Sequence, residues 1–544
     1  MNSNYKAGRV PLLKGLLVIF FAMLGTTLLR PLVTGKAEDQ VLKDQKKQVA
    51  VPDAKPAAPE TGELANQIDG LIDESELGYA RWGISVISMA NGATLYQRNA
   101  DKLFTPASNM KVYTTGVALD LLGADYRWRT SVYASTQLDA SGRIQGDLVL
   151  YGRGAPDLVS RSQDESRGSL AKLADDLYQH GVRRVEGNVI GDESYFRGDP
   201  LGDGWQWTDL QWYFGAEASA LSINGNEIDV NLVPSSGEEP PVMRVSDNES
   251  QVIVQNRMIN GKAGVRTTIG VHRGLSDNNI EVWGELAPGS KGFGARLSVH
   301  NPALWAAKLF FSALKTRGIE IAGQAQARNS RVAQSQRFDP TRSVELAAVS
   351  SQPLSEIVKK TNKESNNLYA ELILRTLGRE RGEMTAQPEP VGRERGDDEA
   401  GRAIIRLWLE RAGIPTSRLA FHDGSGLSRL DLVTPETTAR LLLSYSKTAT
   451  GEAFRQSLPI SGRDGTLGGR LKTLSDRVSA KTGSLTYDNS LSGYLTTPRG
   501  DVLAFSIMCN DQTGRSDSIR LIDQIAMLLG GFPSPSSQKT QKSQ

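Results

Sequence analysis

The stretch Lys102–Gly116, KLFTPASNMKVYTTG, places a serine one helical turn ahead of a lysine, at a point where a helix is expected to begin. Pro106 supplies the fixed φ of a first turn, and the apolar residues that follow continue at helical spacing until Gly123 can end the helix. Ser108 and Lys111 should therefore share one helix face beside unpaired N–H groups, which are the parts of an acyl-transfer nucleophile. An N-cap serine followed by a solvated lysine is the alternative, and for this motif taken alone it is the better interpretation.

Composition excludes several classes of function. The chain has 544 residues, of which 39% are hydrophobic, so it can bury real cores and has room for about two to four domains. Its formal net charge is +2, and Lys and Arg are not gathered on any stretch with interleaved aromatic residues. We therefore expect no polyanionic partner and no nucleic-acid binding.

Cysteine and histidine usage argues against disulfides, metal ions and cofactors. The single cysteine, Cys509, lies in the apolar run LAFSIMCN and is expected to be a buried strand residue, as an exported protein with a large core permits. The four histidines are scattered without the spacing of metal ligands: His180, His272, His300 and His422. No metal site and no cofactor are expected.

The N-terminus carries an export signature. Three basic residues precede the uncharged apolar run Gly15–Leu29, which Arg30 and Pro31 close. This order is typical of an export signal, and the small residues Gly35 and Ala37 would allow cleavage after Ala37. An uncleaved membrane anchor is the alternative, because the run approaches the length of a bilayer span, and a buried core helix is a weaker one. Either functional interpretation carries the rest of the chain across a membrane and predicts a periplasmic protein.

Residues 38–62 and 533–544 have the composition of chain that does not fold. The first segment is rich in Lys, Gln, Asp, Ala and Pro and predicts a linker, and the second predicts a disordered tail. Ordered structure is expected to begin near Glu63.

The ordered part begins with a β-hairpin. Arg81–Met89 is a strand candidate, Asn91-Gly92 is a strong hairpin turn, and Ala93–Gln97 can return as the partner strand. From residue 128 to residue 340 the sequence changes to short β-type runs broken by glycine. Two helices are expected among them: Leu170–His180 and Pro302–Arg317. This region predicts one inserted β-rich domain or two nested ones.

Helical texture returns at about Pro353 and gives way to strands near the C-terminus. The expected helices are Ser355–Lys360, the run that starts at Leu368, Arg402–Gly413, Pro435–Tyr445 and Ser516–Leu529, and the charged residues 379–399 predict an exposed loop. The expected strands are Arg477–Ser484, Ser490–Thr496 and Val502–Cys509. Because the early hairpin and these late strands can join into one sheet with helices on its faces, we predict an α+β domain formed by residues 63–127 and 341–532, split by the insertion.

Three short motifs occur in order along the chain: Ser108-x-x-Lys111, Ser365-x-Asn367 and Lys481-Thr482-Gly483. Each is weak alone, because the polar residues of the second could cap helices and the lysine of the third could be a surface strand residue. Together they form the set found in class A β-lactamases and penicillin-binding proteins. Each also lies in its expected setting, at a helix start, between helices and on a strand leading into a hairpin. The conjunction favours a catalytic site over the separate structural interpretations.

With these motifs the chain resembles the class C low-molecular-mass penicillin-binding proteins, the D-alanyl-D-alanine carboxypeptidases and endopeptidases of peptidase family S13. The long gap between Lys111 and Ser365 distinguishes it from class A β-lactamases, where the two motifs lie much closer. Further stretches look like the same family: TPASNMKV, GRGAPDL, GNVIGDESYF, NKESNNLYAE, DGSGLSR and AKTGSL. The resemblance covers residues 64–532. One departure is Ala155, where the family often has Asp.

The resemblance implies a fold and an activity. The fold would be the antiparallel sheet flanked by helices of the transpeptidase and β-lactamase type. The activity would be that of a serine D-Ala-D-Ala carboxypeptidase that acts on peptidoglycan stem peptides through an acyl-enzyme and is acylated by β-lactam antibiotics. A non-catalytic cell-wall binding or scaffolding protein of the same fold is the alternative, and it would be favoured by a missing motif residue, although none is missing. A β-lactamase is a second rival that the insertion disfavours.

The residue types suggest how such a site would form the nucleophile. The Ser108 hydroxyl needs a base. Since no histidine has the neighbouring residues typical of a catalytic base, the amine of Lys111 is the candidate. Lys111 must then be neutral at least transiently, and burial together with the second cation Lys481 would lower its pKa. Ser365 would relay a proton to the leaving amine, and Asn367 would bond the substrate amide and hold Lys111.

The third motif is expected to bind the substrate. Lys481 would supply fixed positive charge for a terminal carboxylate, aided by Thr482, and Gly483 would let the strand pass close to the substrate. By resemblance, the oxyanion hole would be formed by the backbone N–H groups of Ser108 and Ser484, which stabilise charge that develops only in the transition state.

The stretch HDGSGLS contains a serine, a histidine and an aspartate that suggest a catalytic triad. His422, Asp423 and Ser425 are so close in sequence that they are more typical of a turn, and the GxSxG elbow is absent. We interpret this stretch as a loop near the cleft.

Overall fold

The computed structural model describes residues 62–160, 168–235, 239–247, 249, 252–262, 264, 266–287, 289–332, 336–385, 394–514 and 517–531. The predicted export segment, nearly all of the predicted linker and the predicted tail lie outside these residues. All described residues belong to one unit of the chain, residues 49–544. Within them, no helix combines the length and the hydrophobicity that crossing a bilayer requires.

A five-stranded antiparallel sheet joins the two ends of the ordered chain. Its strand order is β17-β18-β19-β1-β2, and β1 pairs with β19 along its whole length, from Arg81 opposite Asn510 to Ser88 opposite Leu503. The strands are β1 (Arg81–Ser88), β2 (Thr94–Arg98), β17 (Val478–Leu485), β18 (Asp488–Thr496) and β19 (Val502–Asn510). The prediction that the early hairpin joins the late strands in one sheet is confirmed.

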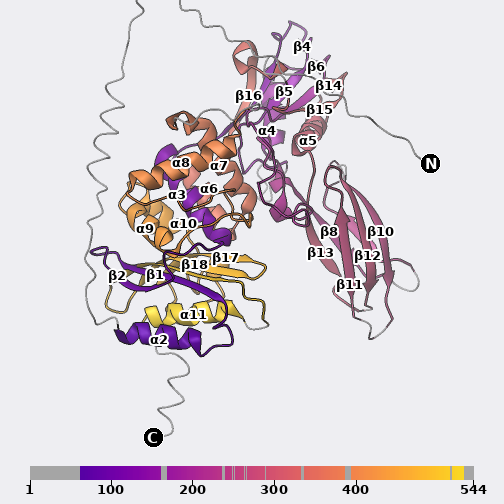
Figure 1. Cartoon of the computed structure of the whole chain (residues 1–544). Coiled ribbons are helices and arrows are strands. Elements are labelled where there is room, and N and C mark those ends of the chain that lie inside the picture. The colour runs from indigo at the N-terminus through magenta and orange to yellow at the C-terminus, as the bar shows by residue number, and fades with distance from the viewer. Residues whose placement is uncertain are drawn as a thin grey trace, which may run out of the picture. The chain divides into compact units, whose positions relative to one another are not determined.

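Helices cover both faces of this sheet, as Figure 1 shows. Side chains of β19 alternate between two hydrophobic cores because successive strand residues point to opposite faces. Phe505 and Ile507 pack in the core under α2 (Gly62–Asp73) and α11 (Ser518–Leu529), whereas Met508 packs in the core on the other face. The helices on that second face are α3 (Met110–Leu122), α6 (Leu354–Glu364), α7 (Asn367–Arg381), α8 (Asp397–Arg411), α9 (Pro435–Tyr445) and α10 (Gly451–Ser457). The predicted α+β class is confirmed.

Helix α3 lies in the middle of this core. Every residue from Met110 to Leu119 is buried, which fits a helix that is largely apolar on all sides. It ends at Gly123, as the sequence predicts. The φ of this glycine is 92°, a value that L-amino acids rarely adopt. The turn that carries Ser108 is a short 3₁₀ helix, Ala107–Asn109, that leads directly into α3.

Three details of the helices differ from the prediction. Helices α2 and α10 were not expected, and the segment 379–399 is not simply an exposed loop. Helix α7 continues to Arg381, and α8 starts at Asp397. The charges at its two ends belong to helices, because basic residues in the last turn of α7 and acidic residues in the first turn of α8 complement the helix dipoles. The loop prediction was therefore wrong for the ends of the segment, and residues 386–393 lie outside the described part of the chain.

The region between α3 and α6 is built from four further sheets and two helices (Figure 1). The largest has the order β15-β7-β5-β3-β16, and the others have the orders β14-β6-β4, β13-β8-β9 and β10-β12-β11. Strand β16 lies beyond residue 340, the predicted end of the insertion, and pairs with β3. The exact domain boundaries stay a prediction.

The strands of this region are β3 (Arg129–Ala134), β4 (Arg143–Ile144), β5 (Leu148–Tyr151), β6 (Arg184–Val185), β7 (Val189–Asp192), β8 (Glu227–Val233), β9 (Val242–Val245), β10 (Ile253–Asn260), β11 (Thr268–Arg273), β12 (Asn279–Leu286), β13 (Phe293–Ser298), β14 (Glu320–Ile321), β15 (Ala325–Arg328) and β16 (Val344–Ser350). Its helices are α4 (Ser169–Gln179) and α5 (Pro302–Arg317). Other short 3₁₀ helices in the described part of the chain are Tyr213–Gly215, Asn224–Asn226, Pro340–Arg342, Gly382–Met384, Gly465–Leu467 and Lys472–Leu474.

Candidate active site

Ser108 lies on the 3₁₀ turn at the start of α3 and is half-buried. The residue before it, Ala107, has a φ of 49°, a left-handed conformation that a residue with a Cβ adopts only when its surroundings impose it. One turn further on, Lys111 is fully buried, and its Nζ lies 2.9 Å from the Ser108 hydroxyl oxygen. The structure thus brings the two residues of the first motif into direct contact.

Lys111 also joins the first motif to the second. Its Nζ donates to the Asn367 side-chain oxygen at 2.7 Å and to the Ser425 backbone carbonyl at 2.7 Å. With the Ser108 hydroxyl, these contacts use all three donors of an ammonium group. Asn367 is the first residue of α7, and its amide nitrogen donates to the carbonyl of Phe214 at 2.9 Å. Lys111 is therefore held by three partners, one of which, Asn367, is held in turn by the Phe214 carbonyl.

The second buried lysine connects the other motif residues. Lys481, on β17, donates to the Ser365 hydroxyl at 2.9 Å and to the Thr482 carbonyl at 2.7 Å. Ser365 closes α6 in the left-handed conformation, with a φ of 59°. The Thr482 hydroxyl lies 2.7 Å from the hydroxyl of Thr466. Two lysine–serine pairs thus face the same site from α3 and from β17.

Burial governs the charge of both lysines. It lowers the pKa of Lys111 to about 7, although the nearby carboxylates of Asp423 and Glu371 act to raise it. Burial, and then repulsion from Lys111, hold the pKa of Lys481 well below its usual range. The expected repulsion between the two lysines lowers the pKa of Lys481. The fixed positive charge expected on Lys481 stays a prediction, and burial opposes it.

The end of β17 is clamped to the turn that carries Ser108. A Cβ on Gly483 would lie 2.3 Å from the Ser490 hydroxyl and 2.8 Å from the Pro106 carbonyl oxygen, so only glycine fits. The Ser490 hydroxyl donates to that same carbonyl at 2.7 Å and accepts from the Asn109 amide at 2.5 Å. Ser484 follows Gly483 and is exposed, with its hydroxyl donating to the Asn489 side chain at 2.7 Å.

The HDGSGLS stretch is a turn around a buried carboxylate. Asp423 accepts from the Ser425 hydroxyl at 3.0 Å and from the indole N–H of Trp205 at 2.9 Å. His422 faces elsewhere, with its Nδ1 2.8 Å from an oxygen of Asp203. The three residues do not form a serine–histidine–aspartate relay. The loop instead presents the Ser425 carbonyl to Lys111.

Sequence reasoning missed Glu371, which supports this loop. It is 1% exposed, and its Oε1 accepts from the backbone N–H groups of Gly424 and Ser425, each at 2.9 Å. Burial raises its pKa to about 7. Its position could have been noticed, because an acid inside the apolar run of α7, four residues after Asn367, lies on the same helix face. No local signal announces Phe214, which is 153 residues from Asn367.

Among the residues that the structure describes, no three histidine, cysteine, aspartate or glutamate side chains are grouped so that they could hold a metal ion. Cys509 is buried in β19, as predicted.

The fold is that of a penicillin-binding protein. The crystal structure of penicillin-binding protein 4 from Haemophilus influenzae superposes with a TM-score of 0.71 at 25% identity, over 85% of this chain and 98% of that chain. That protein has also been solved complexed with a β-lactam, in a structure with a TM-score of 0.66 at 23% identity that covers 86% of this chain and 98% of that chain.

The sequence comparisons define the family. The model of the D-Ala-D-Ala carboxypeptidase 3 (S13) family matches residues 64–530, and the chain belongs to this family. A D-alanyl-D-alanine carboxypeptidase from an Actinomadura species is 32% identical over 483 residues, which span 86% of this chain and 85% of the relative. A second relative, from Haemophilus influenzae, is 29% identical over 416 residues, 75% of this chain and 80% of the relative. The resemblance to family S13 noted in the sequence is confirmed.

Proposed function

We propose that this protein is a serine-type D-Ala-D-Ala carboxypeptidase that acts on peptidoglycan stem peptides, with Ser108 as its nucleophile. The observation that carries the proposal is the 2.9 Å contact between Ser108 and a buried Lys111 whose pKa is about 7. An amine with this pKa is neutral in a large fraction of molecules at neutral pH and can accept a proton. Membership of family S13 supports the choice of reaction.

In the acylation step, the Ser108 oxygen attacks the carbonyl carbon of the penultimate D-alanine. The Ser108 proton passes to the neutral Lys111 nitrogen, and the carbonyl oxygen becomes an oxyanion. We assign the backbone N–H groups of Ser108 and Ser484 as its donors. When the peptide bond breaks, the Ser365 hydroxyl gives its proton to the leaving D-alanine nitrogen and takes in turn the proton that Lys111 received, so that Lys111 is neutral again. The product is an ester of Ser108 with the shortened peptide.

In the deacylation step, a water molecule attacks the ester carbonyl and gives its proton to Lys111. The bond to the Ser108 oxygen then breaks, and that oxygen recovers a proton from Lys111. The shortened peptide leaves as a free acid, and the site returns to its starting state. Asn367 holds Lys111 in place through both steps and offers its amide to the substrate backbone.

The substrate's terminal carboxylate would bind beside Lys481 and Thr482. Because burial lowers the pKa of Lys481, a carboxylate bound beside it would raise that pKa by favouring the protonated form. This arrangement would favour peptides with a free C-terminus. A β-lactam offers the same carboxylate beside a strained amide and would acylate Ser108 by the same attack.

A fluorescent penicillin tests the nucleophile. The wild-type protein should become covalently labelled, and Ser108→Ala should not. No label on the wild type, or equal label on the variant, would reject the assignment. Release of D-alanine from a pentapeptide then separates an enzyme from a non-catalytic cell-wall binding protein. The rate at which the labelled enzyme hydrolyses separates it from a β-lactamase.

Carboxypeptidase and endopeptidase action would use the same nucleophile on different substrates. Digestion of purified cell-wall fragments distinguishes them, because a carboxypeptidase releases only D-alanine whereas an endopeptidase also cleaves cross-linked dimers into monomers. Each activity should disappear in Ser108→Ala.

We further propose that the protein is exported and works in the periplasm. The basic N-terminus and the apolar run Gly15–Leu29 support export, and they leave both a cleaved signal and a retained anchor open. Cell fractionation followed by N-terminal sequencing decides between the two. A soluble periplasmic protein that begins at Glu38 would show cleavage after Ala37, and a membrane-bound protein with an intact N-terminus would show an anchor.

A further inference from the structure

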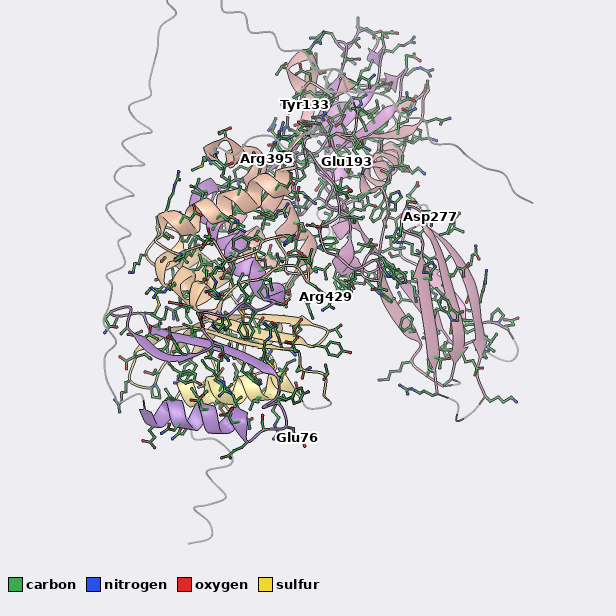
Figure 2. All side chains as sticks on the ribbon, in the orientation of Figure 1. Glu76, Tyr133, Glu193, Asp277, Arg395 and Arg429 are labelled. Atoms are coloured by element: carbon green, nitrogen blue, oxygen red, sulfur yellow. The ribbon has the colours of Figure 1, made fainter. Side chains whose placement is uncertain are left out.

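A second cavity, of about 500 Å³, shares no lining residue with the Ser108 site. It lies at the end of the largest sheet of the middle region. Strands β5 and β7 of that sheet run parallel, and Tyr151, Arg153 and Tyr195 line the cavity just at or beyond their carboxyl ends. In sheets with parallel strands, this edge is where ligands commonly bind. Figure 2 labels Tyr133 and Arg395 near this end of the sheet.

Four arginines line the cavity, and two of them are neutralised. Arg197 pairs with Asp397 at 2.6 Å, and Arg337 pairs with Glu394 at 2.7 Å. The other lining carboxylate, Asp339, accepts from the backbone N–H and the hydroxyl of Thr341, at 2.9 and 2.6 Å. The two arginines are thus neutralised by ion pairs, whereas Asp339 keeps its negative charge because its hydrogen-bond donors are neutral.

The other two arginines, Arg153 and Arg379, have no carboxylate within 4.0 Å among the residues that the structure describes. Arg153 is held by neutral acceptors only, including the Ser131 hydroxyl at 2.9 Å and the Tyr133 hydroxyl at 2.8 Å. Arg379, in the last turn of α7, lies over the ring of Tyr195 at 5.0 Å. Within the part of the chain that the structure describes, the cavity therefore has two arginines without an ion-pair partner against one such carboxylate, Asp339, and keeps a net positive charge.

Aromatic rings form the uncharged part of the lining. Tyr151 packs against Phe338 with ring centroids 5.1 Å apart and against Tyr195 at 6.3 Å. Arg153 lies over the Tyr151 ring at 4.9 Å. These rings offer apolar surface next to fixed guanidinium groups. The volume of the cavity falls within the range of small-ligand sites.

We propose that this cavity binds a small ligand in which a carboxylate or a phosphate is attached to a ring of sugar size. Arginine binds both anions through paired N–H donors, and the tyrosine and phenylalanine rings would pack against the uncharged face of the ligand. This site is independent of the proposed peptidase function, because none of its lining residues forms a hydrogen bond with Ser108, Lys111 or Lys481 within the described structure.

Calorimetric titration of the wild-type protein with three probes tests the proposal. N-acetylmuramic acid offers a carboxylate, N-acetylglucosamine 6-phosphate offers a phosphate, and N-acetylglucosamine is the uncharged reference. At least one of the two acids should bind about tenfold more tightly than the uncharged sugar, and the difference should shrink in high salt. The acid that binds identifies the source of the anion. Binding of neither acid, or equal binding of all three sugars, would overturn the proposal.

Variants locate the binding. Arg379→Gln should weaken the acid by about tenfold or more, whereas Arg499→Gln, an exposed arginine in the turn between β18 and β19, should leave it unchanged. Arg379→Lys keeps the charge and should bind with intermediate affinity, so a folding defect and a lost charge can be told apart. Labelling by a fluorescent penicillin should stay at the wild-type level in Arg379→Gln. Unchanged acid binding in Arg379→Gln would place the ligand elsewhere and reject the site.

Discussion

The Nζ of the fully buried Lys111 lies 2.9 Å from the hydroxyl oxygen of the half-buried Ser108. The same nitrogen is held by the Asn367 side chain and the Ser425 carbonyl, so its position does not depend on its charge alone. Burial keeps the pKa of this amine near 7, in the range where a general base is most useful. The packing of the core therefore sets both the position and the pKa of the Lys111 nitrogen.

The first prediction concerns pH. Only neutral Lys111 can accept the Ser108 proton, so the rate of acylation by penicillin should fall about tenfold per pH unit below pH 7 and level off above it. The second-order rate constant, measured from pH 5 to pH 9, gives the profile. Lys111→Ala should lower the rate by about 10²- to 10⁴-fold and abolish the step near pH 7. A wild-type profile that is flat across this range would contradict the role of Lys111.

The second prediction concerns the proton on Lys481. Burial holds its pKa well below the usual lysine range, and a carboxylate bound beside it should raise that pKa. Binding of a peptide with a free C-terminus should therefore take up a proton at pH 8. Titration calorimetry in two buffers of different ionisation enthalpy measures the uptake, with Ser108→Ala used to prevent turnover. A peptide with an amidated C-terminus is the control and should show no uptake. Equal heats for the free acid in both buffers would refute the prediction.

The third prediction concerns Glu371, a positioning residue. Its Oε1 accepts from the N–H groups of Gly424 and Ser425, and Ser425 in turn holds Lys111. Glu371→Ala would leave both buried donors without this acceptor and should destabilise the fold by about 1–3 kcal/mol. Urea unfolding measures the change.

Glu371→Gln provides the matched control, because it keeps a side-chain oxygen at the same place and removes the charge. It should recover much of the stability. Since the Glu371 carboxylate acts to raise the pKa of Lys111, its loss should also move the acylation midpoint to lower pH. If Glu371→Ala and Glu371→Gln were equally stable, the hydrogen bonds to the loop would not contribute to the free energy of unfolding.

Local signals in the sequence predicted the elements that local chemistry defines. Helices Pro302–Arg317 and Pro435–Tyr445 were predicted to the residue, because each begins with proline at the first position after a residue whose side chain caps the helix. The joining of the early hairpin and the late strands into one sheet was predicted from strand patterns at two distant places, whereas the pairing of β1 with β19 was not. The predicted site residues also lie together, although their catalytic roles stay predictions.

Long-range packing defines what the sequence could not predict. The contact of Asn367 with the Phe214 carbonyl depends on how the middle region folds back on α7, and no short pattern encodes it. The raised pKa of Glu371 and the lowered pKa of Lys481 are consequences of burial. Burial arises only when the core is assembled. The sequence did not predict the boundary near β16 for a related reason. The pairing of β16 with β3 joins strands that lie far apart in the chain.

The last prediction concerns the glycine of the third motif. A Cβ on Gly483 would meet the Ser490 hydroxyl at 2.3 Å and the Pro106 carbonyl oxygen at 2.8 Å, both of which clamp β17 to the Ser108 turn. Gly483→Ala should therefore destabilise the protein by about 1–3 kcal/mol and slow acylation by penicillin, because the turn and Ser484 would be pushed apart.

Gly469→Ala is the matched control for this substitution, since a Cβ there would meet no atom within 4 Å. It should leave both the urea midpoint and the acylation rate at the wild-type values. If Gly483→Ala behaved like Gly469→Ala, the close approach of β17 to the nucleophile turn would have no functional consequence. Slow acylation with unchanged stability would instead show that the glycine is needed for the geometry of the site and not for the fold, because the strand can then move away from the turn at little cost.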